Sequence, residues 1–243
     1  MRIDLLVGLL PLLLLAGLTG WIQRDAMSLV LGWSLALYLV QGALLLGFAP
    51  GRLSGGELGP ANRLTLLRST LVFPIAALLP LWADLGSPTI WWVILLAAVA
   101  LVLDGLDGKV ARMTNSYSAF GARFDMELDA FLILVLSIGV WLGGRAGVWV
   151  LLVGLLRYLF VLAGWLWPRL TAPLPESRRR KVVCVIQGVA LLVALGPIIP
   201  PSLAVASVAL GLAALVYSFG LDTLWLLRYG AGHRSASLPG TDA

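Results

Sequence analysis

Four aspartates lie within a 26-residue stretch of a chain that is otherwise strongly apolar. Asp104 and Asp107 are three residues apart, and Asp125 and Asp129 are four residues apart. On helices, each of these spacings places both carboxylates on one face. Ionised carboxylates are costly in or near lipid and repel one another at close range. The stretch therefore predicts two helix ends that share divalent cations, with Mg²⁺ as the preferred ion.

The same stretch contains small residues at fixed distances from the acids. It resembles the signature of the CDP-alcohol phosphotransferase family, D-x-x-D-G-x-x-A-R followed after eight residues by G-x-x-x-D-x-x-x-D. The residues that fill the eight fixed positions are Asp104, Asp107, Gly108, Ala111, Arg112, Gly121, Asp125 and Asp129. Two helix ends that merely carry solvated charge would not explain these interleaved small residues. The resemblance implies attack of an alcohol on a CDP-linked donor with release of CMP.

The resemblance also implies a role for each acid. Asp104, Asp107 and Asp125 are expected to ligate metal, and Asp129 is expected to serve both as a ligand and as the general base. Four carboxylates exceed what one Mg²⁺ with its waters usually takes. We therefore expect two Mg²⁺ (or Mn²⁺) ions.

Donor contacts are predicted from the other signature positions. Gly108, Ala111 and Gly121 are small where a base and ribose must approach the backbone, although small residues also serve close helix packing in membranes. Arg112 is a candidate for donor phosphate, for an ion pair with an aspartate, or for lipid headgroups.

Further candidates lie outside the signature. Asn62, in ANRLTLLR, resembles the P-N-x-L-T-x-x-R opening of the family's first core helix, which implies contacts at the cytoplasmic face from Asn62, Thr65 and Arg68. Asn62 is equally a candidate helix N-cap. Arg157 lies midway along an apolar segment, so its charge needs a partner or an aqueous cavity. The resemblance implies that Arg157 and Lys181 bind an anionic acceptor group, whereas a salt bridge is the structural alternative for Arg157.

The composition indicates an integral membrane protein. The chain has 243 residues, of which 60% are hydrophobic and 12% charged, against about 25% charged in a soluble domain. The single cysteine excludes an internal disulfide, and His233 in the polar tail is a poor candidate for catalysis. Eight apolar helices are predicted, at Leu5–Ile22, Met27–Phe48, Leu64–Trp82, Thr89–Leu106, Gly121–Leu142, Val148–Trp167, Val182–Ile199 and Leu203–Leu227.

The predicted organisation is an all-α membrane protein with a six-helix catalytic core at 64–229. A two-helix extension at 1–50 and a linker at 51–63 precede the core, and a disordered tail at 230–243 follows it. Basic residues gather in the loops on one side, so the positive-inside rule places the acids and both termini in the cytoplasm. We expect a multi-pass protein of a bacterial inner membrane. The net charge of +5 is read as orientation and headgroup contact, with no nucleic-acid partner.

The function expected from this sequence is transfer of a phosphatidyl group from CDP-diacylglycerol to a small alcohol, with a phosphorylated acceptor weakly favoured. Serine, glycerol 3-phosphate and inositol phosphate stay open as acceptors. Because many members of the family that this chain resembles pair as homodimers, homodimer formation stays open as well. The alternatives are transfer from a CDP-aminoalcohol to diacylglycerol and, in another class, a cation transporter that uses intramembrane acids.

Overall fold

The computed structural model describes residues 1–24, 26–48, 58–113, 119–167 and 177–229. Within these ranges the side chains at 48, 106–113, 119, 178 and 229 are left undescribed. Of the predicted segments, most of the linker and the whole tail lie outside the described residues.

The described residues form α-helices joined by short turns, and no β-strand occurs among them. The all-α prediction is confirmed. The α-helices are α1 (Arg2–Ile22), α2 (Met27–Phe48), α3 (Pro60–Ala77), α4 (Ser87–Met113), α5 (Ala119–Leu142), α6 (Leu151–Leu166), α7 (Arg178–Leu195) and α8 (Pro201–Tyr229). Two 3₁₀ segments, η2 (Leu79–Asp84) and η3 (Val148–Val150), precede α4 and α6.

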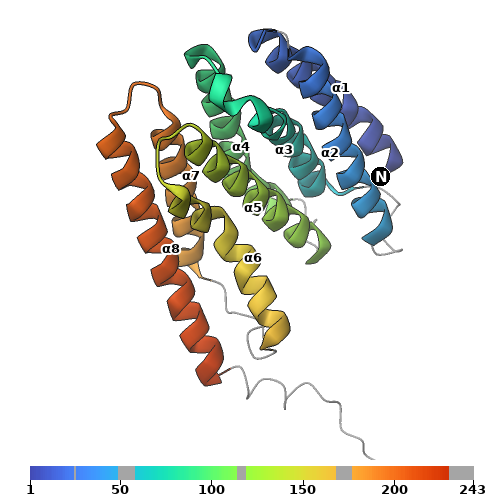
Figure 1. Ribbon diagram of the computed structural model, residues 1–243. Helices are drawn as coiled ribbons and strands as arrows, with labels where there is room; N and C mark the ends of the chain where they lie inside the picture. The colour runs from blue at the N-terminus through green and yellow to red at the C-terminus, as the bar shows by residue number, and fades with distance from the viewer. Residues whose placement is uncertain (25, 49–57, 114–118, 168–176, 230–243) are drawn as a thin grey trace, which may run out of the picture.

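Successive helices alternate in direction (Figure 1). Consequently α1, α3, α5 and α7 begin at one end of the bundle, where α2, α4, α6 and α8 finish. We call this the polar end, because Asp104 lies in the second half of α4 and Asp125 in the first half of α5. The opposite end holds the short turns after η2, α5 and α7.

Five described helices, α1, α2, α4, α6 and α8, are long and apolar enough to cross a membrane. The other three, α3, α5 and α7, carry polar and charged residues, among them Arg68, Asp125 and Gln187. They pack against several neighbours each: α3 contacts α1, α2, α4 and α5, and α7 contacts α4, α5 and α8. The helices with polar side chains are thus enclosed by more apolar ones, as expected for polar groups in a membrane protein.

The hairpin of α1 and α2 is bonded to the rest of the bundle at both of its ends. Near the turn, the Trp92 indole N–H donates to the Thr19 hydroxyl at 2.9 Å. At the polar end, the Asp4 carboxylate accepts hydrogen bonds from Arg63 Nε at 2.7 Å and from the Leu58 N–H at 3.2 Å. These bonds fix the hairpin on α3 and α4, so it forms one packed body with the helices that carry the acids.

The turn at the far end of α5 is tied to the turn between α7 and α8. Arg145 donates from Nε to the Ala194 carbonyl at 2.9 Å, and from Nη2 to the carbonyls of Gly196 and Ile199 at 2.9 and 2.6 Å. Carbonyls at a helix C-terminus lack helical partners, and this guanidinium supplies them. The contact holds the ends of α5 and α7 in a fixed relation away from the acids.

The backbones of helices α5 and α6 come close together at Gly154. A Cβ atom built on Gly154 would lie 2.5 Å from the Leu134 Cα, which is backbone and cannot rotate away. The glycine therefore sets the separation of α5 and α6, and with it the position of Arg157 one turn further along α6.

Replacing Gly154 by alanine is expected to push α6 outward and lower the melting temperature by about 5 °C, measured by a thermal-shift assay in detergent. Gly220→Ala is the matched control, because in the described structure no atom beyond the adjacent turns of α8 lies within 4 Å of the added Cβ. There the usual helix preference for alanine should leave the melting temperature unchanged or slightly raised. Equal effects of the two substitutions would contradict the close contact.

Candidate active site

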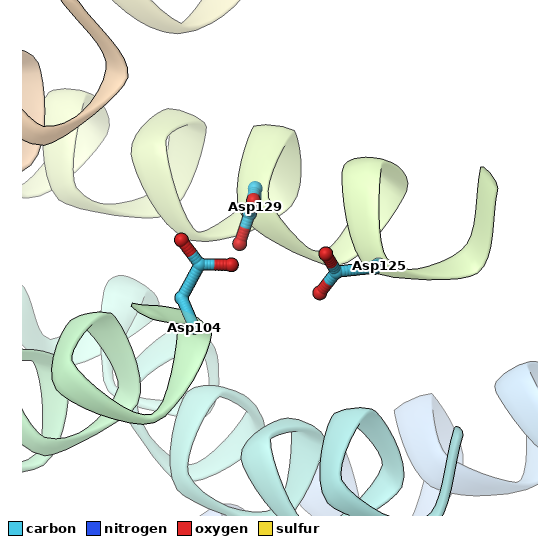
Figure 2. A group of neighbouring side chains, drawn as sticks. All are labelled: Asp104, Asp125 and Asp129. Carbon is cyan, nitrogen blue, oxygen red and sulfur yellow. The ribbon is translucent and has the colours of Figure 1, made fainter. Parts of the chain in front are cut away.

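Three of the four predicted metal-binding aspartates converge at the polar end. Asp104 comes from α4, and Asp125 and Asp129 come from successive turns of α5. One carboxylate oxygen from each lies within 4.8 Å of the other two. Figure 2 shows the three side chains turned toward one another across the space between the helices. The side chain of Asp107 lies outside the described residues.

A buried arginine joins these carboxylates. Arg68, in the middle of α3, is only 1% exposed. Its Nη1 donates to Asp125 and lies 3.1 Å from Asp104 Oδ1, and its Nη2 donates to Asp129. The sequence predicts Arg68 as a contact at the cytoplasmic face and does not by itself reveal this role. The available signal was the one applied to Arg157, namely that an arginine midway along a membrane helix needs a partner.

The local charge balance favours a divalent cation. Three ionised carboxylates carry three negative charges and Arg68 supplies one positive charge, so these four side chains together carry a net charge of −2. Partial burial, with the three side chains 21–31% exposed, weakens the screening of their repulsion by water. Oxygen ligands with this net charge suit Mg²⁺ or Mn²⁺. The triad therefore fits a metal, with Asp104, Asp125 and Asp129 as the residues to hold it.

Two cavities meet at Asp129. The first, of about 220 Å³, lies among α4, α5 and α7; beyond Asp104 and Asp129 its lining is mostly apolar and includes Leu101, Val102, Val185 and Val189. We call it the apolar cavity. The second, of about 180 Å³, lies among α5, α6, α7 and α8. Asp129, Ile133 and Cys184 line both, so the carboxylate of Asp129 stands at their junction.

The second cavity, which we call the basic cavity, is lined by Arg157, Arg180, Gln187 and Ser218. Arg157 donates from Nη2 to Glu127, so the salt bridge considered from the sequence is present. Its buried Nε, however, makes no hydrogen bond to the described residues, and neither does Nε2 of Gln187, a side chain only 6% exposed. Donors left over in this way are available to a ligand.

Arg180 is held at this cavity by an acid on α8. Asp222 is 7% exposed, and its Oδ1 accepts a hydrogen bond from Arg179 and lies 3.5 Å from Arg180 Nη1. Lys181, the predicted acceptor ligand on α7, is exposed and lies beside Arg180 in the sequence. Within the described part of α7, the basic residue that lines the cavity is therefore Arg180.

Of the remaining predicted residues, Asn62 and Gly121 have described positions, whereas the other three have undescribed side chains. Asn62 is 4% exposed and lies inside α3, whose N-cap is Gly59 and whose first residue is Pro60. The N-cap reading of Asn62 is therefore wrong, because the proline occupies the first helical position, where a missing N–H costs nothing. Gly121 lies in the first turn of α5. Gly108, Ala111 and Arg112 fall in the part of α4 whose side chains are not described.

Comparison with known proteins adds three findings. The family model for CDP-alcohol phosphatidyltransferase matches residues 59–219. The chain is 56% identical over 34 residues to a CDP-diacylglycerol–serine O-phosphatidyltransferase of Helicobacter pylori, a match covering 14% of each chain. It is 39% identical over 66 residues to cholinephosphotransferase 1 of Xenopus laevis, covering 26% of this chain and 16% of that one. The curated relatives are thus matched over less than a fifth of their length, and no solved structure matches.

Replacing Asp125 by asparagine is expected to weaken Mn²⁺ binding at least tenfold, because one anionic ligand of three becomes neutral. Binding is followed by the loss of the free-ion electron paramagnetic resonance signal on titration of purified protein. Asp84→Asn is the matched control, since that acid is exposed at the end of η2, at the opposite end of the bundle. An unchanged affinity in the Asp125 variant would contradict a metal site at the triad.

Proposed function

Because this chain belongs to the CDP-alcohol phosphatidyltransferase family, we propose that it transfers a phosphatidyl group from CDP-diacylglycerol to a small alcohol and releases CMP. The observation that carries the proposal is the position of Asp129. Its carboxylate belongs to the acid triad and also lines both cavities. A general base in this reaction must reach the incoming hydroxyl close to the metal-bound phosphate, and Asp129 is suited to that position.

The chemistry follows from the charges of the triad. Asp104, Asp125 and Asp129 would hold a divalent ion, which would supply charge neutralisation for the donor's diphosphate and for the departing CMP. The acceptor oxygen attacks the β-phosphorus, a new O–P bond forms, and the bond to the CMP oxygen breaks. The hydroxyl proton passes to Asp129. A second ion is proposed with Asp107 as a further ligand, in keeping with the four acids of the signature.

The apolar cavity supports a lipid donor. It begins at Asp104 and Asp129 and continues past Leu101, Val102 and Val189, which lie toward the middle of their helices. A diacylglycerol group attached to the reacting phosphate would find apolar surface there. We propose that the nucleotide lies on the other side of the acids. Its proposed contacts are Asn62, Gly108, Ala111, Arg112 and Gly121.

The basic cavity supports an acceptor that carries an anionic group. Arg157 and Arg180 line it, and Gln187 contributes an amide donor without a partner among the described residues. Guanidinium groups bind carboxylate or phosphate through charge-assisted hydrogen bonds. Serine, glycerol 3-phosphate and inositol phosphate all meet this requirement. Lys181, which lies in the first turn of α7, stays a proposed contributor to acceptor binding.

A second candidate is transfer from a CDP-aminoalcohol to diacylglycerol, which the similarity to cholinephosphotransferase 1 favours. Two arginines beside Asp129 would repel a quaternary ammonium group, however, so the basic cavity favours the first candidate.

We propose that the polar end faces the cytoplasm of a bacterial cell. Among the described residues it carries Arg2, Arg63, Arg179, Arg180, Lys181 and Arg228, whereas the opposite end carries Arg24, Arg145 and Asp84. This distribution supports the orientation through the positive-inside rule.

The decisive test is CMP release by the purified protein in detergent, with Mg²⁺ and either CDP-diacylglycerol plus a panel of alcohols or CDP-choline plus diacylglycerol. We expect CMP from CDP-diacylglycerol with an acceptor that bears a carboxylate or phosphate. Asp129→Asn should lower the rate at least a thousandfold while donor binding persists, because a base and a ligand are lost but other ligands remain.

Wild-type protein that releases CMP only from CDP-choline would establish the second candidate in place of the first. Full turnover by Asp129→Asn would overturn the assignment of the base. Asp84→Asn serves again as the acid distant from the triad.

Arg157→Met is expected to raise the acceptor KM at least tenfold and leave the donor KM nearly unchanged, because a charge-assisted contact in the basic cavity is removed. Initial rates at varied acceptor concentration measure the effect. Arg123→Met is the control, since Arg123 lies on α5 but lines a separate groove facing α2 and α3. A larger change in the donor KM than in the acceptor KM would place the acceptor elsewhere.

A further inference from the structure

Arg68 is the largest of the fully buried side chains and connects three helices through one guanidinium group. From α3 it donates to Asp125 and Asp129 on α5 and approaches Asp104 on α4 at 3.1 Å. Its Nε also donates to the Ala100 carbonyl on α4, one turn before Asp104, at 3.1 Å. Each nitrogen of the guanidinium thus has a named partner in the acid site or directly beside it.

This arrangement has a strong electrostatic reason. An unpaired arginine buried at 1% exposure would be very costly, and so would three carboxylates facing one another without a cation. Each group compensates the other. The Arg68 contacts use the oxygens Asp104 Oδ1, Asp125 Oδ1 and Asp129 Oδ1, one from every member of the triad.

We propose that Arg68 is a built-in counter-ion, which holds the three carboxylates together when no divalent ion is bound and yields carboxylate oxygens to the ion when it binds. Of the proposed function, this inference needs only the part that the triad binds a metal ion. It makes Arg68 a positioning residue that acts through the acids.

Two opposite consequences follow from this role. Without Arg68, the acids lose this compensating charge, so the fold should become more dependent on metal for its stability. At the same time a positive charge beside the ion is removed, so the ion should bind more tightly. A purely structural arginine would lower stability to the same extent with or without metal and would not tighten metal binding.

The test uses the full-length protein in detergent, as wild type, Arg68→Met, Arg68→Lys and Arg145→Met, all purified with Mn²⁺ present. Arg145→Met is the matched control because it also loses a guanidinium with three hydrogen bonds, but to backbone carbonyls at the far end of the bundle. Melting temperatures are measured in excess chelator and in saturating Mn²⁺, and Mn²⁺ affinity is measured by electron paramagnetic resonance.

In chelator, Arg68→Met is expected to melt about 10 °C below wild type, and saturating Mn²⁺ should restore most of the difference. Its Mn²⁺ affinity should rise about tenfold. Arg68→Lys keeps the positive charge and should keep the Mn²⁺ affinity close to wild type, with a smaller loss of melting temperature in chelator than Arg68→Met, because lysine cannot form all the contacts of the guanidinium group. Arg145→Met should lose the same melting temperature in chelator and in Mn²⁺, with unchanged affinity.

The counter-ion role would be overturned if Arg68→Met lost the same melting temperature in chelator and in Mn²⁺. Weaker Mn²⁺ binding by that variant, or failure to purify it even with Mn²⁺ present, would also overturn the role. So would an Arg68→Lys variant that behaves like Arg68→Met. CMP release by wild type is measured in parallel. If wild type releases CMP but Mn²⁺ does not restore the melting temperature of Arg68→Met, this inference alone is refuted. If Mn²⁺ restores that melting temperature but wild type releases no CMP from any donor, the proposed function alone is refuted.

Discussion

The repulsion among Asp104, Asp125 and Asp129 is the constraint that the rest of this structure must satisfy. Their carboxylates come within 4.8 Å of one another in a bundle whose surroundings are apolar. Like charges at this range are tolerated only beside positive charge. Arg68 supplies one such charge from α3, and in doing so it fixes α3 against both α4 and α5.

The arrangement of the other helices follows from enclosing these charges. The more polar helices α3, α5 and α7 contact one another or α4 beside the triad, and the apolar helices α1, α2, α6 and α8 each contact at least one of them. The basic cavity lies beside Asp129, where α6 and α7 bring Arg157 and Arg180 toward α5. Gly154 makes this possible, since it allows α6 to approach the backbone of α5.

The family relationship and the geometry of the helices are separate sources of evidence, because the family model does not cover all of the packed helices. The family model covers 59–219, which leaves the α1–α2 hairpin outside it, yet Asp4, Thr19 and Gln23 bond the hairpin to α3 and α4. The curated relatives match over short segments only, so the argument for an anionic acceptor does not rest on them. That argument depends on the side chains of the basic cavity, in particular on Arg157 and Gln187.

The sequence by itself determined the all-α fold, the family and the acid signature, because helical spacing and apolar segment length are local properties. The pairing of Asp125 with Asp129 on one face needs only four residues of helix. Tertiary structure decided which distant residue reaches which acid. Arg68 and Asp125 are separated by 57 positions, Arg157 and Glu127 by 30, and Arg179 and Asp222 by 43. Such pairs depend on helix packing and rotation, and no periodicity within one segment specifies them.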